Sequence, residues 1–109
     1  MKISVLLPYK ENFASEYAGA VSIFINSINS KSSYKDEITV YGNTKYKKIL
    51  SKNYCNLSLK NKSIIQSNSD FYVNNFIKKK SVINSEIIEI HNRPNYIKKI
   101  LLLKKIKKN

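Results

Sequence analysis

The sequence predicts an α/β domain, in which helices lie on the faces of a mostly parallel sheet. Short β-rich apolar runs alternate with amphipathic segments along the 109 residues, and this alternation is typical of parallel strands joined by crossover helices. The apolar content of 42% suits a globular protein and is too high for a disordered one. The length suits one small domain, and no repeat or linker divides it.

Four segments are expected to form strands. The first, Lys2–Leu7, is an apolar run that ends at Pro8. The second is Glu37–Tyr41, which is followed by a Gly-Asn turn signal. Tyr54–Leu59 alternates loosely and is the expected third strand, and Glu86–Ile90 is the fourth. These runs would form a partial Rossmann-like sheet.

Three helices are expected between and after these strands. Apolar residues recur at three- and four-residue steps over Tyr17–Ile28, as on one face of a helix. Ser67–Ser69 offers N-cap candidates for a second helix across Asp70–Lys80. Pro94 suits the first turn of a third helix. The polar segment Thr44–Lys52 has only a short helix as a possibility.

Ligands of parallel α/β sheets bind beyond the carboxyl ends of the strands. Tyr9–Ala20 holds that position after the first strand, and His91–Pro94 holds it after the fourth. Gly19 and Ala20 begin the first helix, where free amides and the helix dipole favour a phosphate or carboxylate. A glycine that packs the helix against the sheet is an equally good interpretation.

The only histidine and the only arginine of the chain stand two residues apart, after the fourth strand. His91 can carry a proton or donate to a sugar or phosphate oxygen, and Arg93 can hold a phosphate or carboxylate. Alternatively, His91 caps the strand while Arg93 faces solvent. The acidic residues form no cluster with metal-ligand spacing, so no metal is expected.

The chain is strongly basic, with 20 Lys and Arg against 7 acidic residues and a net charge of +13. Such a field attracts nucleic acid or an anionic membrane surface. A single arginine and the lack of a helix-turn-helix or basic-aromatic motif favour a solvated lysine surface over a nucleic-acid site. Cys55 is the only cysteine, which fits a reducing cytoplasm, and it is expected to be buried.

Two stretches resemble family 4 glycosyltransferases, which have the GT-B fold. Lys2-Ile-Ser-Val-Leu-Leu-Pro8 followed by Ala18-Gly-Ala-Val-Ser22 is similar to their start, where the junction usually reads Gly-Gly. Glu86-Ile-Ile-Glu-Ile-His-Asn-Arg-Pro94 is similar to their strand that ends in a histidine motif. The His-Asn-Arg-Pro form is common among bacterial members that act on cell-surface polysaccharides. The resemblance covers roughly residues 1–100.

The resemblance implies that residues 1–97 are a partial, acceptor-side Rossmann-like domain and that 98–109 are a lysine-rich tail. It implies transfer, with retention, of a sugar from a nucleotide-sugar to a cell-surface glycan or lipid-linked acceptor, without metal or other cofactor. Gly19 and Ala20 would lie near the donor phosphates or sugar, His91 near the transferred sugar, and Asn92 and Arg93 on the acceptor side.

The family holds most of the donor in a second domain, so the chain is expected to be inactive alone. The lone cysteine predicts a cytoplasmic location. The chain's lysine-rich end interleaves with the apolar run Ile100–Leu103, which suits peripheral contact with the inner face of the plasma membrane. The sheet edge after the fourth strand is expected to be exposed and apolar. The alternative is a small basic α/β protein that binds nucleic acid or an anionic membrane surface.

Overall fold

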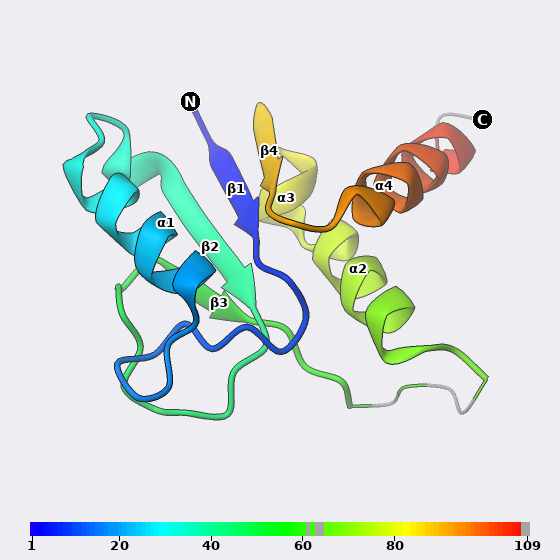
Figure 1. Cartoon of the computed structure of the whole chain (residues 1–109). Helices are drawn as coiled ribbons and strands as arrows, with labels where there is room; N and C mark the ends of the chain where they lie inside the picture. Colours follow the sequence, from blue (N-terminus) through cyan, green and yellow to red (C-terminus); the bar gives the residue numbers. More distant parts are fainter. Residues whose placement is uncertain (61, 63–64, 108–109) are drawn as a thin grey trace.

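The computed structural model describes residues 1–60, 62 and 65–107, with side chains as far as residue 102. It contains a four-stranded sheet in the order β3-β2-β1-β4, in which every pairing is parallel. The strands are β1 (Ile3–Leu6), β2 (Ile38–Gly42), β3 (Tyr54–Asn56) and β4 (Ile87–Ile90). The predicted fold class, a partial Rossmann-like sheet with helices on its faces, is therefore confirmed (Figure 1).

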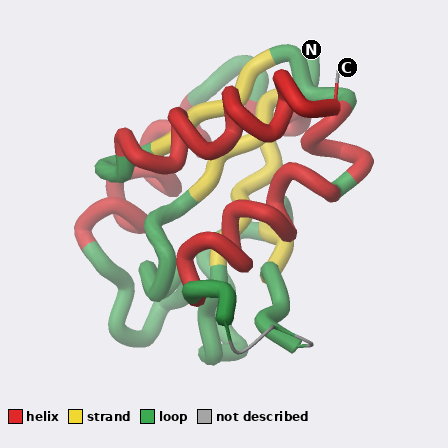
Figure 2. Tube along the Cα trace, turned by 90° about the vertical axis from the view of Figure 1, so that its right-hand side faces the viewer, coloured by secondary structure: helices red, strands yellow, loops and turns green. Residues whose placement is uncertain are grey.

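Helices cover both faces of the sheet. The helix α1 (Ala20–Lys31) lies on one face, and α2 (Asn68–Lys78), α3 (Lys80–Ile83) and α4 (Pro94–Lys107) lie on the other. Figure 2 looks onto the face that carries these three helices. A short 3₁₀ helix, η1 (Lys35–Glu37), precedes β2.

The strand β1 lies in the middle of the sheet, where helices bury the apolar residues on both of its faces. Val5, Leu6 and Leu7 are at most 1% exposed, as expected of a parallel strand buried on both sides. Ile3 pairs with Ile38 of β2 on one side and with Ile87 of β4 on the other. β4 therefore forms one edge of the sheet.

Each face of the sheet has its own apolar core. The core under α1 consists mainly of Val5, Leu7, Phe13, Ile25, Ile38 and Val40. The core under α2–α4 is larger and richer in aromatic residues: Leu6, Tyr41, Leu57, Tyr72, Val73, Phe76, Ile77, Val82, Tyr96 and Ile100. The Tyr72 hydroxyl crosses this core and donates to the Leu7 carbonyl oxygen at 2.7 Å. Burial raises the pKa of Tyr72 well above its ordinary value.

The helix predictions hold at some ends and fail at others. Ser67 is the N-cap of α2, and its Oγ accepts from the Asp70 amide at 3.1 Å. The first helix begins at Ala20 and not at Tyr17, which has a left-handed φ of 56° and stays in the loop. The second helix stops at Lys78, because Lys79 has extended backbone angles before α3 begins.

The segment Thr44–Lys52 contains no helix, so the possible short helix there is wrong. Its backbone pairs with the loop after β1 instead: Ser15 N–H donates to Lys48 O at 2.9 Å, and Leu50 N–H donates to Phe13 O at 3.2 Å. The third strand is shorter than expected and ends at Asn56. Its Cys55 is half-buried against the aromatic core and not fully buried.

The last helix is continuous across residues 97 and 98, where the lysine-rich tail was expected to begin. Tyr96 and Ile100 of this helix are both buried in the aromatic core. Leu101 and Leu102 are each 62% exposed. None of the helices in the described ranges combines the length and the apolar character that crossing a bilayer requires.

Candidate functional site

The loops that follow β1, β2 and β4 lie together at the carboxyl ends of the strands, an end of the sheet named here the carboxyl edge. Residues with strained backbone angles occur in these loops. Lys10, Tyr17 and Asn92 have φ values of 71°, 56° and 56°, and they are the non-glycine residues with positive φ in the described part of the chain. Strained loop conformations concentrate at ligand sites, and parallel sheets bind ligands at this end.

The start of α1, where a phosphate was expected, already receives an anion from the chain itself. The Glu11 carboxylate accepts from the Ser22 amide at 3.2 Å. A Cβ at Gly19 would lie 2.1 Å from Glu11 Oε2, so the glycine makes room for this carboxylate. Gly19 is the N-cap and Ala20 is exposed at the first helical position. An external phosphate there would have to displace Glu11.

The histidine motif lies at the end of the edge strand. His91 Nε2 is 3.4 Å from Glu89 Oε2, and its side chain is 27% exposed. Asn92 is exposed with left-handed backbone, and Arg93 Nη1 donates to the Asn92 carbonyl oxygen at 2.7 Å. Arg93 is thus exposed and bonded to its own segment.

The structure brings His91 beside α1, not beside Gly19. A hollow of about 310 Å³ is bounded by β4 with His91 and by apolar side chains of α1 that include Phe24 and Ile28. Within the described residues, no hydrogen bond or ion pair joins His91–Arg93 to Gly19 or Ala20. The two predicted segments therefore lie at the same end of the sheet, and no described hydrogen bond or ion pair joins them.

A second hollow at the carboxyl edge joins part of the predicted segment Tyr9–Ala20 to the loop after β2, which the sequence alone did not single out. It lies between the loop after β1 and the loop after β2, has a volume of about 390 Å³, and is named here the edge hollow. Its lining residues are Tyr9, Lys10, Asn12, Asn43, Lys45 and Tyr46. Tyr-Lys-Glu-Asn and Asn-Thr-Lys-Tyr each follow a strand in the sequence, and that shared composition was the available signal.

Hydrogen bonds hold the rim of the edge hollow in place. Thr44 N–H donates to Asn56 Oδ1 at 2.8 Å, and Thr44 Oγ1 donates to Asn12 Oδ1 at 3.1 Å. The Tyr9 amide donates to the Tyr96 hydroxyl at 3.2 Å, and its ring packs on that of Tyr72 at 5.4 Å. Because both loops are tied to strands or core residues, the hollow is largely preformed.

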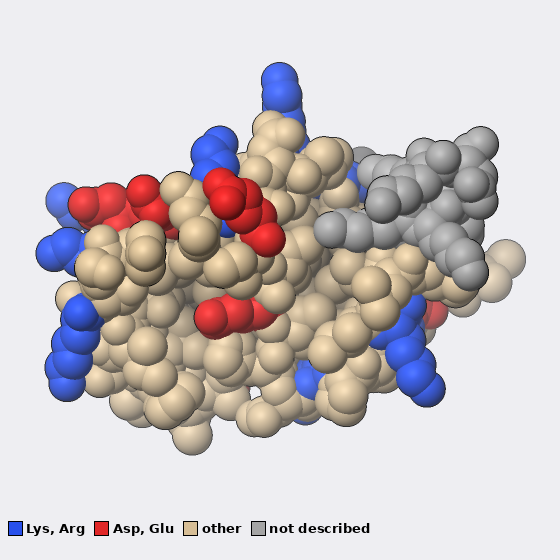
Figure 3. All heavy atoms as spheres, turned by 90° about the horizontal axis from the view of Figure 1, so that it is seen from above, with Lys and Arg blue, Asp and Glu red and all other residues tan. Residues whose placement is uncertain are grey.

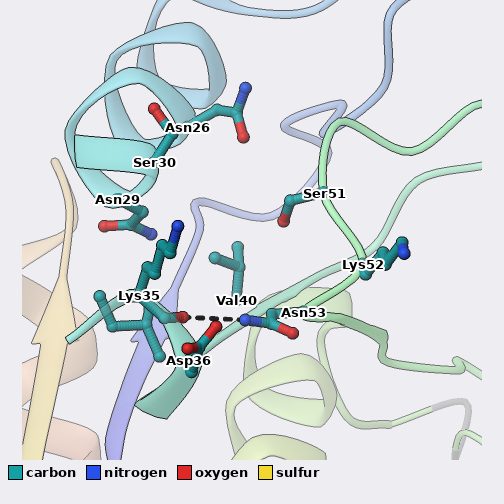
Figure 4. A pocket seen from close by; sticks show the side chains of 10 residues that line it. Asn26, Asn29, Ser30, Lys35, Asp36, Val40, Ser51, Lys52 and Asn53 are labelled. Atoms are coloured by element: carbon teal, nitrogen blue, oxygen red, sulfur yellow. Dashed lines mark hydrogen bonds between the residues drawn. The ribbon is translucent and has the colours of Figure 1, made fainter. Parts of the chain in front are cut away.

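A different polar hollow lies at the opposite end of the sheet. It has a volume of about 300 Å³ and is bounded by α1, by η1 and by the residues before β3. Figure 4 shows the Asn53 side chain pointing at the Lys35 carbonyl oxygen, to which it donates at 2.9 Å. This hollow includes Asp36 and lies at the amino ends of β2 and β3, where parallel sheets seldom bind ligands.

Charge is mixed at that opposite end. Seen from the amino ends of the strands, Lys and Arg side chains stand singly, and Asp and Glu side chains lie among them (Figure 3). The Glu37 carboxylate forms an ion pair with the amino-terminal ammonium group, with 3.2 Å between Oε2 and the nitrogen. No group of three or more His, Cys, Asp or Glu side chains suited to a metal occurs among the described residues.

No family model matches the chain, and no curated protein or solved structure matches it either. The class of protein is therefore defined by the fold and the carboxyl edge alone: a small parallel α/β domain with a polar, lysine-bearing hollow beside its central strands.

Proposed function

We propose that this chain is the acceptor-side domain of a retaining glycosyltransferase of GT-B type. It would bind the cell-surface glycan or lipid-linked sugar that receives a sugar from a nucleotide-sugar donor. The observation that carries the proposal is the edge hollow. Its amides and phenols can exchange hydrogen bonds with sugar hydroxyls, and its tyrosine rings offer apolar surface to a sugar ring.

The histidine motif has a role of its own in this proposal. His91 would lie near the transferred sugar, with its Nε2 3.4 Å from the Glu89 carboxylate. Asn92 and Arg93 would contact the acceptor. Gly19 and Ala20 would approach the donor phosphates once Glu11 leaves the helix end. No metal takes part.

The residues assigned to the donor are few, so the chain by itself is expected to bind sugar without transferring it. We propose that this sugar binding takes place in the cytoplasm. Contact with the inner face of the plasma membrane would come from α4, where Ile97, Leu101 and Leu102 are exposed next to Lys98. Such a contact would bring the domain to lipid-linked acceptors.

NMR titration of the ¹⁵N-labelled chain tests the proposal. Galactose, added to about 20 mM because single sugars bind weakly, should shift the amide signals of residues 9–12 and 43–46. UDP-galactose should also shift signals near Gly19 and His91. Shifts confined to the opposite hollow, around Lys35 and Asn53, would contradict the proposal, as would sugar binding that shifts none of these signals.

A second candidate function is peripheral membrane binding through α4 alone. The exposed apolar side chains of this helix, with the neighbouring lysine, favour it. Sedimentation with vesicles of phosphatidylcholine, with and without phosphatidylserine, measures it. Membrane binding that is lost in Leu101→Asp, without any sugar-induced shift at the edge hollow, would support this candidate over the first.

A further inference from the structure

The edge hollow combines sugar-binding groups with positive charge. We infer that its ligand is an acidic sugar, one whose ring carries a carboxylate or a phosphate. This inference rests on the proposed function, since it names the chemical class of the acceptor that the same site would receive. The negative charge of the acceptor is the new element, because the family resemblance does not specify it.

The lining of the edge hollow is positively charged. Lys10 and Lys45 contribute two ammonium groups, and the lining contains no carboxylate. Neither lysine forms an ion pair with an acidic residue in the described ranges. Glu11, the acid next to Lys10 in the chain, points its carboxylate to the start of α1 instead. Both cations therefore remain available to an anionic ligand.

The loop after β2 strengthens this field. The segment from Asn43 to Leu50 has three lysines and no acidic residue. Lys45, Lys47 and Lys48 are exposed. At the amino ends of the strands, by contrast, acidic side chains lie among the cations (Figure 3). The loop after β2 thus adds positive charge beside the hollow, whereas the loop after β1 contains Glu11 and Glu16 as well as Lys10.

The two ammonium groups of the hollow lie over tyrosine rings. Lys10 Nζ lies 5.8 Å from the centroid of the Tyr9 ring, and Lys45 Nζ lies 5.6 Å from that of Tyr46. Each wall of the hollow therefore presents an ammonium group that lies over an aromatic ring. A sugar that enters the hollow would meet these two ammonium groups. A carboxylate or phosphate on that sugar would form charge-assisted hydrogen bonds with them, which are stronger than those of a hydroxyl.

A preformed hollow suits a small acidic sugar better than a polynucleotide. Its volume of about 390 Å³ falls within the usual range of small-molecule sites, roughly 300–1,000 Å³. Nucleic-acid sites need a continuous basic track, usually with several arginines. This chain has one arginine, and it lies after β4, outside the hollow.

Three sugars that differ only at C6 test the inference by NMR titration: galactose, galacturonic acid and galactose 6-phosphate. Removing both lysines with Lys10→Gln and Lys45→Gln should abolish the preference for the acidic sugars over galactose. A matched control removes two other exposed lysines, Lys78→Gln and Lys98→Gln, and should keep that preference.

The acidic sugars should bind about three- to ten-fold more tightly than galactose, the increment expected of two exposed ion contacts. Equal binding of all three sugars at residues 9–12 and 43–46 would overturn the inference and leave the proposed function standing. Tight, steeply salt-dependent binding of a uridine oligonucleotide, with no sugar binding, would overturn both. Acidic-sugar binding that the control variant also weakens would show general charge attraction and would overturn the inference.

Discussion

Replacing Tyr72 with phenylalanine tests the contact that anchors the carboxyl end of β1. The Tyr72 side chain is fully buried, and its hydroxyl donates to Leu7 O across 65 residues of sequence. The substitution keeps the ring and leaves the Leu7 carbonyl without this donor. A buried acceptor that loses its partner costs about 1–3 kcal/mol of unfolding free energy, so Tyr72→Phe should destabilise the chain by that amount at pH 7.

Tyr72 also makes the free energy of unfolding depend on pH in the alkaline range. Burial raises the pKa of Tyr72 in the folded state, so the folded chain keeps this proton while the unfolded chain loses it above pH ~10. The stability from this group is complete below that pH and decreases as the pH rises. At pH 11 the loss reaches about 1.4 kcal/mol. Phenylalanine cannot ionise, so the difference in unfolding free energy between the two proteins should shrink by about 1.4 kcal/mol between pH 7 and pH 11.

Urea unfolding of both proteins at pH 7, 9, 10 and 11 measures this difference. Ionisation of lysines and of Tyr54, whose pKa burial also raises, occurs in both and cancels. Tyr34→Phe is the matched control, because Tyr34 is 49% exposed, and it should change stability at no pH. Parallel loss of stability in the Tyr72→Phe variant and the parent between pH 10 and 11 would refute the reasoning.

Three further predictions concern the helices. Ser67→Ala removes the cap of α2 and should lower the unfolding free energy by about 1 kcal/mol in urea titrations, whereas Ser67→Asp should not. Gly19→Ala would place a methyl group against the Glu11 carboxylate and should destabilise the chain; in a Glu11→Ala background the same change should cost much less. Asp70 has a lowered pKa because Lys99 pairs with it. Stability should therefore fall as the pH drops below about 4, by under ~1 kcal/mol for an exposed pair, and Asp70→Asn should lack this component.

The sequence predicts the strands well because burial on two faces requires an uninterrupted apolar run. Val5, Leu6 and Leu7 are such a run, and the structure buries all three. Helix ends are harder to predict. Tyr17 continues the apolar periodicity of α1, but it sits in a left-handed conformation and is 76% exposed. Apolar periodicity indicates which side of a helix faces the sheet, but it does not indicate at which residue the helix begins.

The edge hollow was not predictable in the same way. Its two walls come from Tyr9–Asn12 and Asn43–Tyr46, segments about thirty residues apart that meet only because β1 and β2 are neighbours in parallel register. Glu11 shows the converse case. Glycine at a helix start fits an anion site, yet the anion that the structure places there is a side chain of the same loop.

The two candidate segments differ in how well the fold supports them. The edge hollow follows β1 and β2, each of which is paired on both sides. His91 follows β4, an edge strand where Ile87 is 41% exposed, and Phe24 of the neighbouring α1 is 57% exposed. Backbone groups on the outer side of such a strand have no ladder partner within the sheet. The loops of the edge hollow should therefore be held in place more firmly than His91, which follows a strand that is paired on one side only.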